Sequence, residues 1–284
     1  MNKDIRIRYK MRAPVSHIGE TASTGTIFQT VLTKDGRLPV ITGNSMRGTL
    51  RDCSALDLLE TVGCKVDKEV FNILFSGGNL NGTMKNDVGK AKNVRSLFPS
   101  ISLLGGGLGD MIMQGKLIAG NLYPVCSETE EMLGEEAHGI SWRSLIDEIE
   151  MTRMDNTKDD KLEKYIENAD IESKSKASTQ MRFSVQYMAI GTEFVQDVKL
   201  VDCTELEMGA FYAAIKKWFE KPVLGGMSAK GFGLFDGDAG LVYEVSDTVV
   251  IEPEAQELID KFHNFVKENI TEETFNTLVT KGGK

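Results

Sequence analysis

The chain opens with a stretch in which apolar and basic residues alternate. In residues 5–12, IRIRYKMR, bulky apolar or aromatic side chains occupy every second position and four cations occupy the positions between them. Because successive side chains of a strand point to opposite faces, this period of two predicts a half-buried strand. Its basic face has two interpretations: an ordinary solvated strand face, or a surface that lies near an anionic partner.

Three later segments have the apolar spacing of helices. The first starts at residues 42–45, TGNS, which supply turn and N-cap side chains, and its leucines continue to about Glu60. Residues 205–219 and 253–269 each carry one apolar stripe, which is typical of a helix that covers a sheet. We therefore expect helices at these three places.

Short apolar stretches predict the remaining strands. These strands lie within residues 28–41, 114–126, 181–190, 194–202 and 241–251. We expect the first to fold around a Lys-Asp-Gly turn, the third and fourth to form a β-hairpin around Gly191, and the last to be one strand. This order of elements favours an α+β fold with a mainly antiparallel sheet and helices on one face.

Two parts of the chain depart from these patterns. Residues 60–125 are less regular and contain a glycine-rich stretch, so we interpret them as an inserted, irregular, finger-like region. Residues 128–180 are polar and rich in charge, which favours a projecting insertion. The length of 284 residues is compatible with a single domain that includes both insertions.

A glycine-rich loop, VLGGMSAKGFGLF at residues 223–235, follows the helix predicted at 205–219. Four glycines within nine residues indicate unusual backbone dihedrals or the close approach of another group. That group is either the protein's own backbone, in a tight turn that completes the sheet, or a phosphate chain. The residues alone leave both interpretations open.

The composition limits the classes of function. A net charge of −9 argues against a generic nucleic-acid-binding protein but permits a local basic strip on an acidic body. The four cysteines form no C-x-x-C pair and the three histidines lie far apart, so we expect free thiols and no zinc site. Because the sequence has no signal-peptide pattern and no apolar run of membrane-spanning length, we expect a cytoplasmic protein with no membrane partner.

The common catalytic motifs do not occur in the sequence. A Walker phosphate loop, a G-x-G-x-x-G fingerprint, a G-x-S-x-G elbow and an H-E-x-x-H pair are all missing. No set of nucleophile, base and orienting residue is evident either. We therefore expect a protein that is not an enzyme.

Two arginines stand out at the start of the first predicted helix. Arg47 and Arg51 are four residues apart and so share one helix face. Cations at a helix N-terminus oppose the helix dipole, which favours an additional reason for their presence, such as an external anion. The alternative is a pair of ordinary surface arginines.

Four segments then carry a resemblance to a known family. In chain order these are HIGE at 17–20, LPVITGNSMRGTLRD at 38–52, GTEF at 191–194 and LGGMSAKGFGLF at 224–235. Together they resemble the RAMP superfamily of CRISPR effector proteins, which has an I-x-G-x-S-x-x-G-x-x-R helix start and a terminal glycine-rich loop. Within that superfamily the chain is most similar to the backbone subunit of "Cas-seven" type, and closest to the backbone subunit of type IV complexes.

This resemblance implies a fold and a function. The fold would be an RRM-like (ferredoxin-like) palm with an inserted thumb at residues 150–182. The subunit would oligomerise as a filament along CRISPR RNA (crRNA), hold its sugar-phosphate backbone and present the guide for pairing with a target nucleic acid. Its partners would be crRNA, the target, copies of itself and other CRISPR effector subunits, without a cofactor.

The resemblance also implies the site residues. The candidate RNA-binding residues are His17, Asn44, Ser45, Arg47, Arg51, Ser228, Lys230, Gly231, Phe232 and Gly233. The candidate thumb residues are Arg153, Met154 and Arg182. Lys230 would pair with a phosphate. His17 would stack or hydrogen-bond near the RNA, with a local loop anchor as the alternative.

One departure from the family pattern bears on catalysis. Type III backbone subunits carry a catalytic aspartate between the two N-terminal motifs, whereas the nearest matching positions here are Ile27, Phe28 and Gln29. Asp35 lies further on, near the following turn. We therefore expect a backbone that does not cut RNA and no metal site. The alternatives are a type III-like RNA endonuclease that uses Asp35 or an acid of the thumb, and a protein-interaction module that kept the fold without binding RNA.

Overall fold

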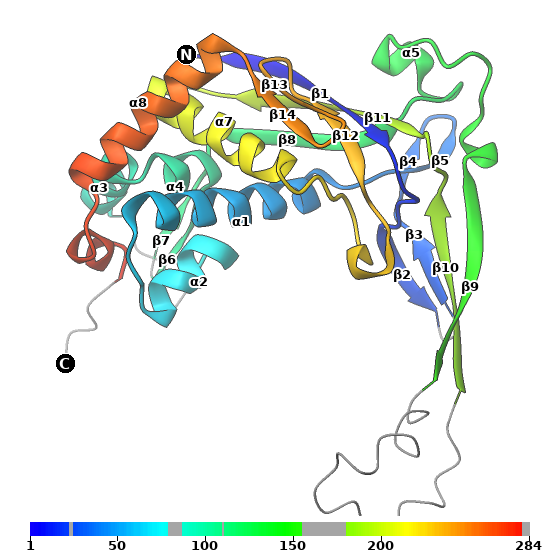
Figure 1. Cartoon of the computed structure of the whole chain (residues 1–284), viewed down its shortest axis with the longest axis horizontal. Coiled ribbons are helices and arrows are strands. Elements are labelled where there is room, and N and C mark those ends of the chain that lie inside the picture. Colours follow the sequence, from blue (N-terminus) through cyan, green and yellow to red (C-terminus); the bar gives the residue numbers. More distant parts are fainter. Residues whose placement is uncertain (23–24, 79–86, 110, 155–179, 280–284) are drawn as a thin grey trace, which may run out of the picture.

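The computed structural model describes residues 1–22, 25–78, 87–109, 111–154 and 180–279. Its centre is a six-stranded sheet with three long helices on one face, as Figure 1 shows. The helices are α1 (Gly43–Val62), α7 (Glu205–Phe219) and α8 (Pro253–Asn269). The strands are β1 (Lys3–Met11), β8 (Leu117–Pro124), β11 (Glu193–Leu200), β12 (Phe235–Asp238), β13 (Val242–Val245) and β14 (Thr248–Ile251).

The topology of this sheet is that of an RRM-like palm. The strands lie in the order β14-β13-β12-β1-β11-β8, and every neighbouring pair is antiparallel. The chain order β1-α1-β8-β11-α7-β12 is a β-α-β-β-α-β unit, the ferredoxin-like arrangement. The predicted α+β class, with helices on one face of an antiparallel sheet, is confirmed.

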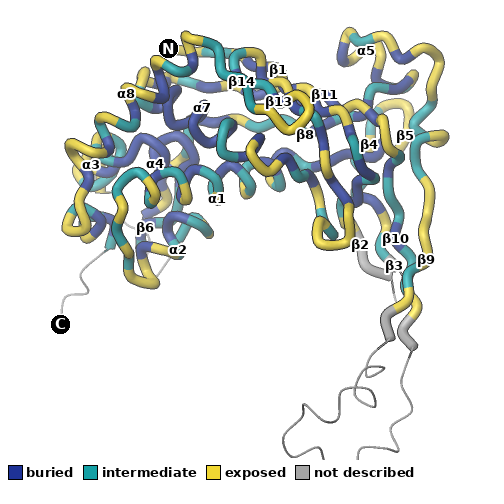
Figure 2. Tube along the Cα trace, in the orientation of Figure 1, coloured by how far each residue is buried: buried dark blue, intermediate teal, exposed yellow. Residues whose placement is uncertain are grey.

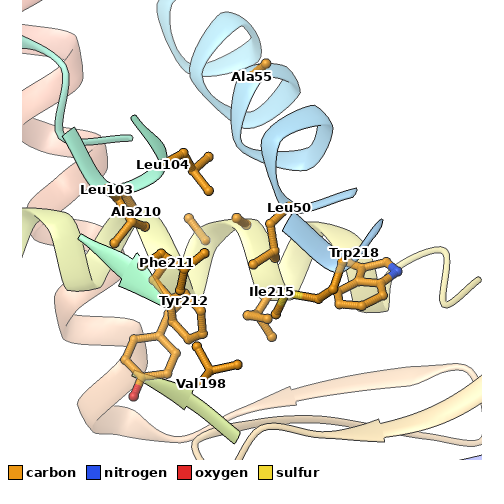
Figure 3. Close-up of a cluster of buried hydrophobic side chains, with 14 of the residues drawn as sticks. Leu50, Ala55, Leu103, Leu104, Val198, Ala210, Phe211, Tyr212, Ile215 and Trp218 are labelled. Carbon is orange, nitrogen blue, oxygen red and sulfur yellow. The ribbon is translucent and has the colours of Figure 1, made fainter. Parts of the chain in front are cut away.

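The core lies between this sheet and its helices. Ile5, Ile7, Tyr9 and Met11 of β1 are buried, as the alternating pattern predicts. From the helix side, α7 contributes aromatic and aliphatic residues that meet leucines of α1 and of a neighbouring short helix (Figure 3). The buried hydroxyl of Tyr9 donates to Oε1 of Gln196 at 2.7 Å, so this polar group is satisfied inside the core.

The basic side chains on the exposed face of β1 form ion pairs with acidic side chains of the same chain. Arg6 contacts Asp197 at 2.9 Å, and Arg8 contacts Glu135 at 2.6 Å. Lys10 lies 3.8 Å from Glu193. The anions next to this face therefore come from β11 and from the loop around Glu135, which favours the interpretation as an ordinary strand face.

A second, four-stranded sheet stands at one end of the palm. It contains β2 (Ile18–Ala22), β3 (Gly25–Phe28), β9 (Ile146–Met154) and β10 (Gln180–Met188), in the order β2-β3-β10-β9. The predicted hairpin of residues 181–190 and 194–202 is wrong, because β10 pairs with β9 and β3 whereas β11 pairs with β1 and β8. Gly191, with φ of 84°, turns the chain from one sheet to the other.

Two further strand predictions can be compared with the structure. Residues 28–41 form the predicted turn between β4 (Thr30–Thr33) and β5 (Gly36–Pro39). Residues 241–251 form two strands, not one, because Ser246 and Asp247 adopt positive φ of 52° and 65° and reverse the chain. Oε1 of Glu244 accepts a hydrogen bond from the backbone N–H of Asp247 at 2.6 Å and stabilises this turn.

Residues 60–125, predicted to be irregular, contain several regular elements where the structure describes them. These are α2 (Lys68–Ser76), α3 (Val88–Leu97), α4 (Pro99–Leu104), β6 (Gly106–Leu108), β7 (Met111–Met113) and β8. Asp67 and Asp87 cap α2 and α3 by accepting hydrogen bonds from the backbone N–H groups of Val70 and Lys90. That this region is an insertion remains a prediction.

The remaining elements that the structure describes are short. They are α5 (Glu130–Leu133) and three 3₁₀ segments at Trp142–Ser144, Ser228–Lys230 and Glu273–Thr277. Figures 1 and 2 show that α2 and the four-stranded sheet project from opposite ends of α1 towards the same side, which gives the molecule the shape of an arch.

The predicted thumb falls partly on described residues. Strands β9 and β10 pair antiparallel up to Met154 opposite Gln180. In this ladder Arg153 lies opposite Met181, and the exposed Arg182 lies opposite Thr152. Residues 155–179, the greater part of the predicted thumb, lie outside the described residues. The boundaries of the thumb therefore remain a prediction.

Candidate nucleic-acid interface

The first part of the candidate site is the N-terminus of α1. Thr42 is the N-cap, and its side chain accepts a hydrogen bond from the backbone N–H of Ser45 at 3.4 Å. A Cβ at Gly43 would lie 2.3 Å from the carbonyl oxygen of Ala119, so only glycine lets the helix begin directly against β8. The helix start is therefore fixed on the edge of the palm sheet.

His17 belongs to this helix start. Its Nε2 accepts a hydrogen bond from the backbone N–H of Thr42 at 3.2 Å and lies 3.3 Å from the hydroxyl oxygen of Thr42. Burial lowers the pKa of His17 below its ordinary value, which favours the neutral imidazole that this contact requires. These contacts are those of a local loop anchor at the helix cap; a role of His17 in RNA contact remains a prediction.

Arg47 and Arg51 are half-buried and bound to backbone carbonyls. Arg51 donates to the carbonyl oxygens of Gly105 and Leu104 at 2.9 and 3.2 Å, and Arg47 also donates to that of Leu104. Gly77, which ends α2, lies next to the same guanidinium, since a Cβ there would be 3.2 Å from Cζ of Arg51. Both arginines therefore meet the end of α4, and Arg51 also meets the end of α2, where helix dipoles favour cations. They are not ordinary surface arginines.

The positive charges of Arg47 and Arg51 lie close enough to repel each other. Burial is the main cause of the lowered pKa of Arg51, and the positive charge of Arg47 adds to it. Nε of Arg47 is buried and has no hydrogen-bond partner in the part of the chain that the structure describes. A guanidinium has five N–H donors, so each arginine can accept an anion besides its carbonyl partner.

A groove of about 740 Å³ opens beside these arginines. Its lining includes Asn44, Arg47 and Arg51 from the start of α1 and the glycine backbone at 105–106. Ile112 and Ile118, which are 59% and 57% exposed, also line the groove and supply apolar surface. Cations, exposed backbone and apolar side chains in one groove suit the phosphate and the base of a nucleotide chain.

The second part of the candidate site is the glycine-rich loop. Gly225 and Gly233 have φ of 75° and 88°, and a Cβ would lie 2.4 Å from the carbonyl oxygen of Ser16 and 2.2 Å from that of Leu224, respectively. The close approach at these two glycines is therefore to the protein's own backbone. Gly231 differs, because its φ is 84° but a Cβ would meet nothing within 4 Å.

The exposed part of this loop lies over β10. The ammonium of Lys230 is 4.4 Å from the centre of the Phe183 ring, a cation–π contact. Phe232 is buried and packs edge to face with Tyr187, with 6.2 Å between the ring centres. Lys230 is itself exposed, so it can contact a ligand while the aromatic pair holds the loop on the sheet.

The predicted site residues thus fall into three groups. His17, Asn44, Ser45, Arg47 and Arg51 gather at the start of α1, whereas Ser228, Lys230, Gly231, Phe232 and Gly233 lie in the loop next to β10. The third group, Arg153, Met154 and Arg182, lies on the β9–β10 ladder. Sequence reasoning missed the glycine backbone at 105–106, Ile112 and Ile118 as parts of the groove; the run GGG at 105–107 was the available signal.

No group of three or more His, Cys, Asp or Glu side chains in the described ranges is placed to hold a metal ion. Asp35, the acid considered for catalysis, is exposed at the turn between β4 and β5. Of the helices that the structure describes, none is long and apolar enough to span a membrane.

Comparison with known proteins places this fold in a family. A chain of a solved structure titled "Type IV-B CRISPR Complex" superposes with a TM-score of 0.59 at 18% identity, covering 88% of this chain and 94% of that one. The crystal structure of Csc2 from Thermofilum pendens gives a TM-score of 0.41 at 13% identity, covering 97% and 82%. No curated protein matches. The sequence profile of the RAMP superfamily matches residues 10–236, and the chain therefore belongs to the RAMP superfamily.

Proposed function

We propose that this chain is a backbone subunit of a CRISPR effector complex that coats a guide RNA and does not cut nucleic acid. The observation that carries the proposal is the groove lined by Asn44, Arg47 and Arg51 together with a glycine backbone and two exposed isoleucines. Its cations and apolar surface are matched to a single-stranded phosphate chain rather than to a small metabolite. Membership in the RAMP superfamily and the fold shared with a chain of a type IV-B CRISPR complex support the same role.

The acidic character of the chain is compatible with this role. Many surface cations pair with the chain's own acids, as on β1, where Arg6 and Arg8 face Asp197 and Glu135. The two arginines of the groove donate to backbone carbonyls instead, and within the described ranges neither forms a salt bridge with a carboxylate. RNA would therefore be drawn to the groove and repelled by most of the remaining surface.

Gly48 offers a direct test of the groove. It is exposed on α1, four residues after Asn44 and beside Arg47, and a Cβ at this position would meet nothing within 4 Å. Substitutions there change the charge of the helix face without disturbing the hydrogen bonds of either arginine. Gly48→Ala is the matched control, because alanine also raises helix propensity by about 1 kcal/mol.

The experiment measures the affinity for labelled single-stranded RNA of guide length by fluorescence anisotropy. We expect Gly48→Lys to bind more tightly than Gly48→Ala, and Gly48→Glu to bind about tenfold more weakly. Equal affinities for the three variants, or no RNA binding by any of them at low salt, would overturn the proposal. The second outcome would leave a protein-interaction module as the function.

The absence of cutting is tested with the same protein. The wild-type chain loaded with a guide RNA is incubated with a complementary target and with Mg²⁺ or Mn²⁺. We expect an intact target. Cleavage that is lost in Asp35→Ala, with guide binding unchanged, would instead establish a metal-dependent endonuclease.

A further inference from the structure

A cluster of three carboxylates and one guanidinium lies where the glycine-rich loop returns to the palm sheet. The guanidinium belongs to Arg12, the residue that follows β1. Its Nη1 lies 2.9 Å from Oδ1 of Asp247, its Nε lies 3.1 Å from Oδ1 of Asp236, and its Nη2 lies 3.7 Å from Oε1 of Glu244. One positive charge would therefore face three negative charges if all four groups were ionised.

Glu244 is the buried acid of this cluster. Its side chain is 0% exposed, whereas the side chains of Asp236 and Asp247 are 35% and 83% exposed. Oε1 of Glu244 accepts a hydrogen bond from the backbone N–H of Asp247 at 2.6 Å. Oε2 is buried and has no hydrogen-bond partner within the described ranges. An ionised carboxylate with one short hydrogen bond and no cation in direct contact is costly at such a depth.

The contacts of Arg12 leave Glu244 poorly compensated. Nη1 of Arg12 donates to Asp247. Nε of Arg12 and Oδ1 of Asp236 are both buried, and in the described part of the chain neither takes part in a hydrogen bond. Burial is the main cause that raises the pKa of Glu244 above its ordinary value, and the charges of Asp236 and Asp247 add to it. The N–H of Asp247 and the charge of Arg12 act in the opposite direction without cancelling the rise.

The two further cations beside Glu244 are both paired with other carboxylates. The remaining charged side chains that line its pocket of about 250 Å³ are Arg8, Lys10, Glu193 and Asp238. Arg8 lies 2.6 Å from Glu135, and Lys10 lies 3.8 Å from Glu193. On the same strand as Glu244, the hydroxyl of Tyr243 donates to Glu252 at 3.3 Å. From the helix side, α7 contributes Trp218 and Phe219, which pack on Phe235 and carry no charge.

The cluster also holds the end of the glycine-rich loop. The backbone N–H groups of Arg12 and Ala13 donate to the carbonyl oxygen of Leu234 at 2.8 and 3.1 Å. Asp236 follows two residues later in β12, so Arg12 holds this end of the loop through its backbone and through its side chain. The N–H of Gly233 donates to the carbonyl oxygen of Pro14 at 2.7 Å. A shift of Arg12 would therefore be transmitted to the loop.

We propose that Glu244 retains a proton in the folded chain above the pH at which an exposed glutamate loses it, and that this proton keeps Arg12 on Asp236 and so positions the glycine-rich loop. When the proton leaves to solvent as the pH rises, the ionised Glu244 attracts the guanidinium of Arg12 away from Asp236. Arg12 and Glu244 are positioning residues, since neither has to contact RNA. The inference adds regulation to the proposed function, and only its RNA measurement rests on that function.

The first experiment compares the wild type with Glu244→Gln by urea unfolding from pH about 5 to about 8.5. Glutamine has the shape of the protonated acid and does not titrate, so the difference between the two proteins reports this proton. Between the two pKa values of Glu244 the folded chain binds a proton that the unfolded chain has lost, so the stability of the wild type falls as the pH rises. We expect Glu244→Gln to gain on the wild type by up to about tenfold in the unfolding constant per pH unit.

The sign of this difference decides the inference. If Glu244 were ionised and paired with Arg12, the wild type would be more stable than Glu244→Gln at neutral pH and would lose that advantage as the pH falls. Such a result, or a difference that does not change with pH, would overturn the inference. Glu268→Gln is the control, because Glu268 is exposed on α8 and its variant should keep the pH profile of the wild type.

Asp247→Asn is a second variant that does not require glutamine at a buried position. Asparagine tolerates the positive φ of 65° at this turn, and the side chain that it replaces is 83% exposed. Removing this charge relieves the repulsion of Glu244 and releases Nη1 of Arg12. The fall of stability with rising pH should therefore end at a lower pH than in the wild type, and an unchanged profile would contradict the inference.

Two further measurements test the positioning of the loop. In hydrogen exchange at pH about 8.5, the amides of residues 233–235 should be less protected in the wild type than in Glu244→Gln. Affinity for a short single-stranded RNA should fall about fivefold more in the wild type than in Glu244→Gln between pH about 6 and about 8.5. Equal exchange and equal RNA profiles would overturn the positioning role. Absence of RNA binding by every protein would overturn the proposed function, while unfolding and exchange still decide this inference.

Discussion

The backbone N–H of Thr42 donates a hydrogen bond to Nε2 of His17 at 3.2 Å. Thr42 caps α1, so this bond fastens the segment before β2 to the start of the groove-lining helix. The preceding residue, Ser16, pairs with Gly226 of the glycine-rich loop. Ser16 and His17 therefore connect the glycine-rich loop with the start of α1, the two parts of the candidate interface. Loss of either contact should alter the position of both parts.

The first prediction concerns the pH dependence that His17 gives to stability. Burial lowers its pKa in the folded chain below the ordinary 6.5. Between these two pKa values the unfolded chain binds a proton and the folded chain does not, so the free energy of unfolding falls as the pH drops below about 6.5. His17→Gln should lose about 1 kcal/mol at neutral pH and show a shallower decline in acid. Urea unfolding at pH about 7.5 and about 5.5 measures both effects.

The control for this prediction is His138→Gln. His138 is exposed, so the variant should keep the pH dependence of the wild type. If His17→Gln retained the full acid sensitivity, the hydrogen bond to Thr42 would not be the source of it.

The second prediction separates two glycines of the same loop. Gly233→Ala forces a Cβ to within 2.2 Å of the carbonyl oxygen of Leu224, whereas Gly231→Ala meets no atom within 4 Å. Both residues have positive φ, so both variants pay a conformational cost of about 1 kcal/mol, but only Gly233→Ala adds a steric clash. Thermal unfolding should therefore show a much larger loss for Gly233→Ala, and similar losses would contradict the assignment.

The sequence predicted the palm well because its elements carry local signals. The period of two in β1 and the apolar stripes of α7 and α8 reflect burial on one face, which is imposed by the sheet itself. The N-cap at Thr42 lies where the TGNS motif indicated it. Each of these features depends on neighbours in sequence, so one chain was enough to predict it.

Strand partners were not predictable in the same way. The alternation of apolar and polar residues predicts that β10 and β11 are strands, but it does not indicate which strands pair with them. β10 pairs with β9 across the 25 residues at 155–179, and only the three-dimensional fold supplies that neighbour. The turn at Ser246 and Asp247 escaped prediction because neither residue is glycine.

The site was predicted residue by residue but not as a shape. The arginine spacing indicated an anion, yet the carbonyls of Leu104 and Gly105 are the partners that the structure records for Arg51. These carbonyls lie more than fifty residues away in sequence, so no local pattern linked them to the helix. The groove exists because α4 ends against α1, which is a tertiary contact.

The third prediction concerns the contribution of Arg51 to the stability of the fold. Its two hydrogen bonds to carbonyls at the end of α4 involve a charged donor and are partly buried, so Arg51→Ala should lower the free energy of unfolding by about 2–3 kcal/mol. Arg51→Lys should recover only part of this, because an ammonium cannot reproduce the planar fork. Arg143→Ala, an exposed surface pair with Glu128, is the control and should cost about 0–1 kcal/mol. Urea unfolding compares the three, and equal losses for Arg51→Ala and Arg143→Ala would contradict this structural role.

The fourth prediction uses Lys230 to measure phosphate contact from the loop. Lys230 is exposed over the Phe183 ring, so Lys230→Met keeps an unbranched side chain on the aromatic surface and removes only the charge. If the ammonium neutralises one phosphate, the affinity for single-stranded RNA should fall for all sequences alike, and the slope of log affinity against log salt should become shallower by about 0.7. Fluorescence anisotropy at several salt concentrations gives this slope.

Lys221→Met is the matched control, because Lys221 is an exposed lysine two residues before the same loop. An unchanged slope in Lys230→Met, or an equal change in both variants, would mean that Lys230 only holds the loop on β10, and the RNA path would then be confined to the groove beside α1.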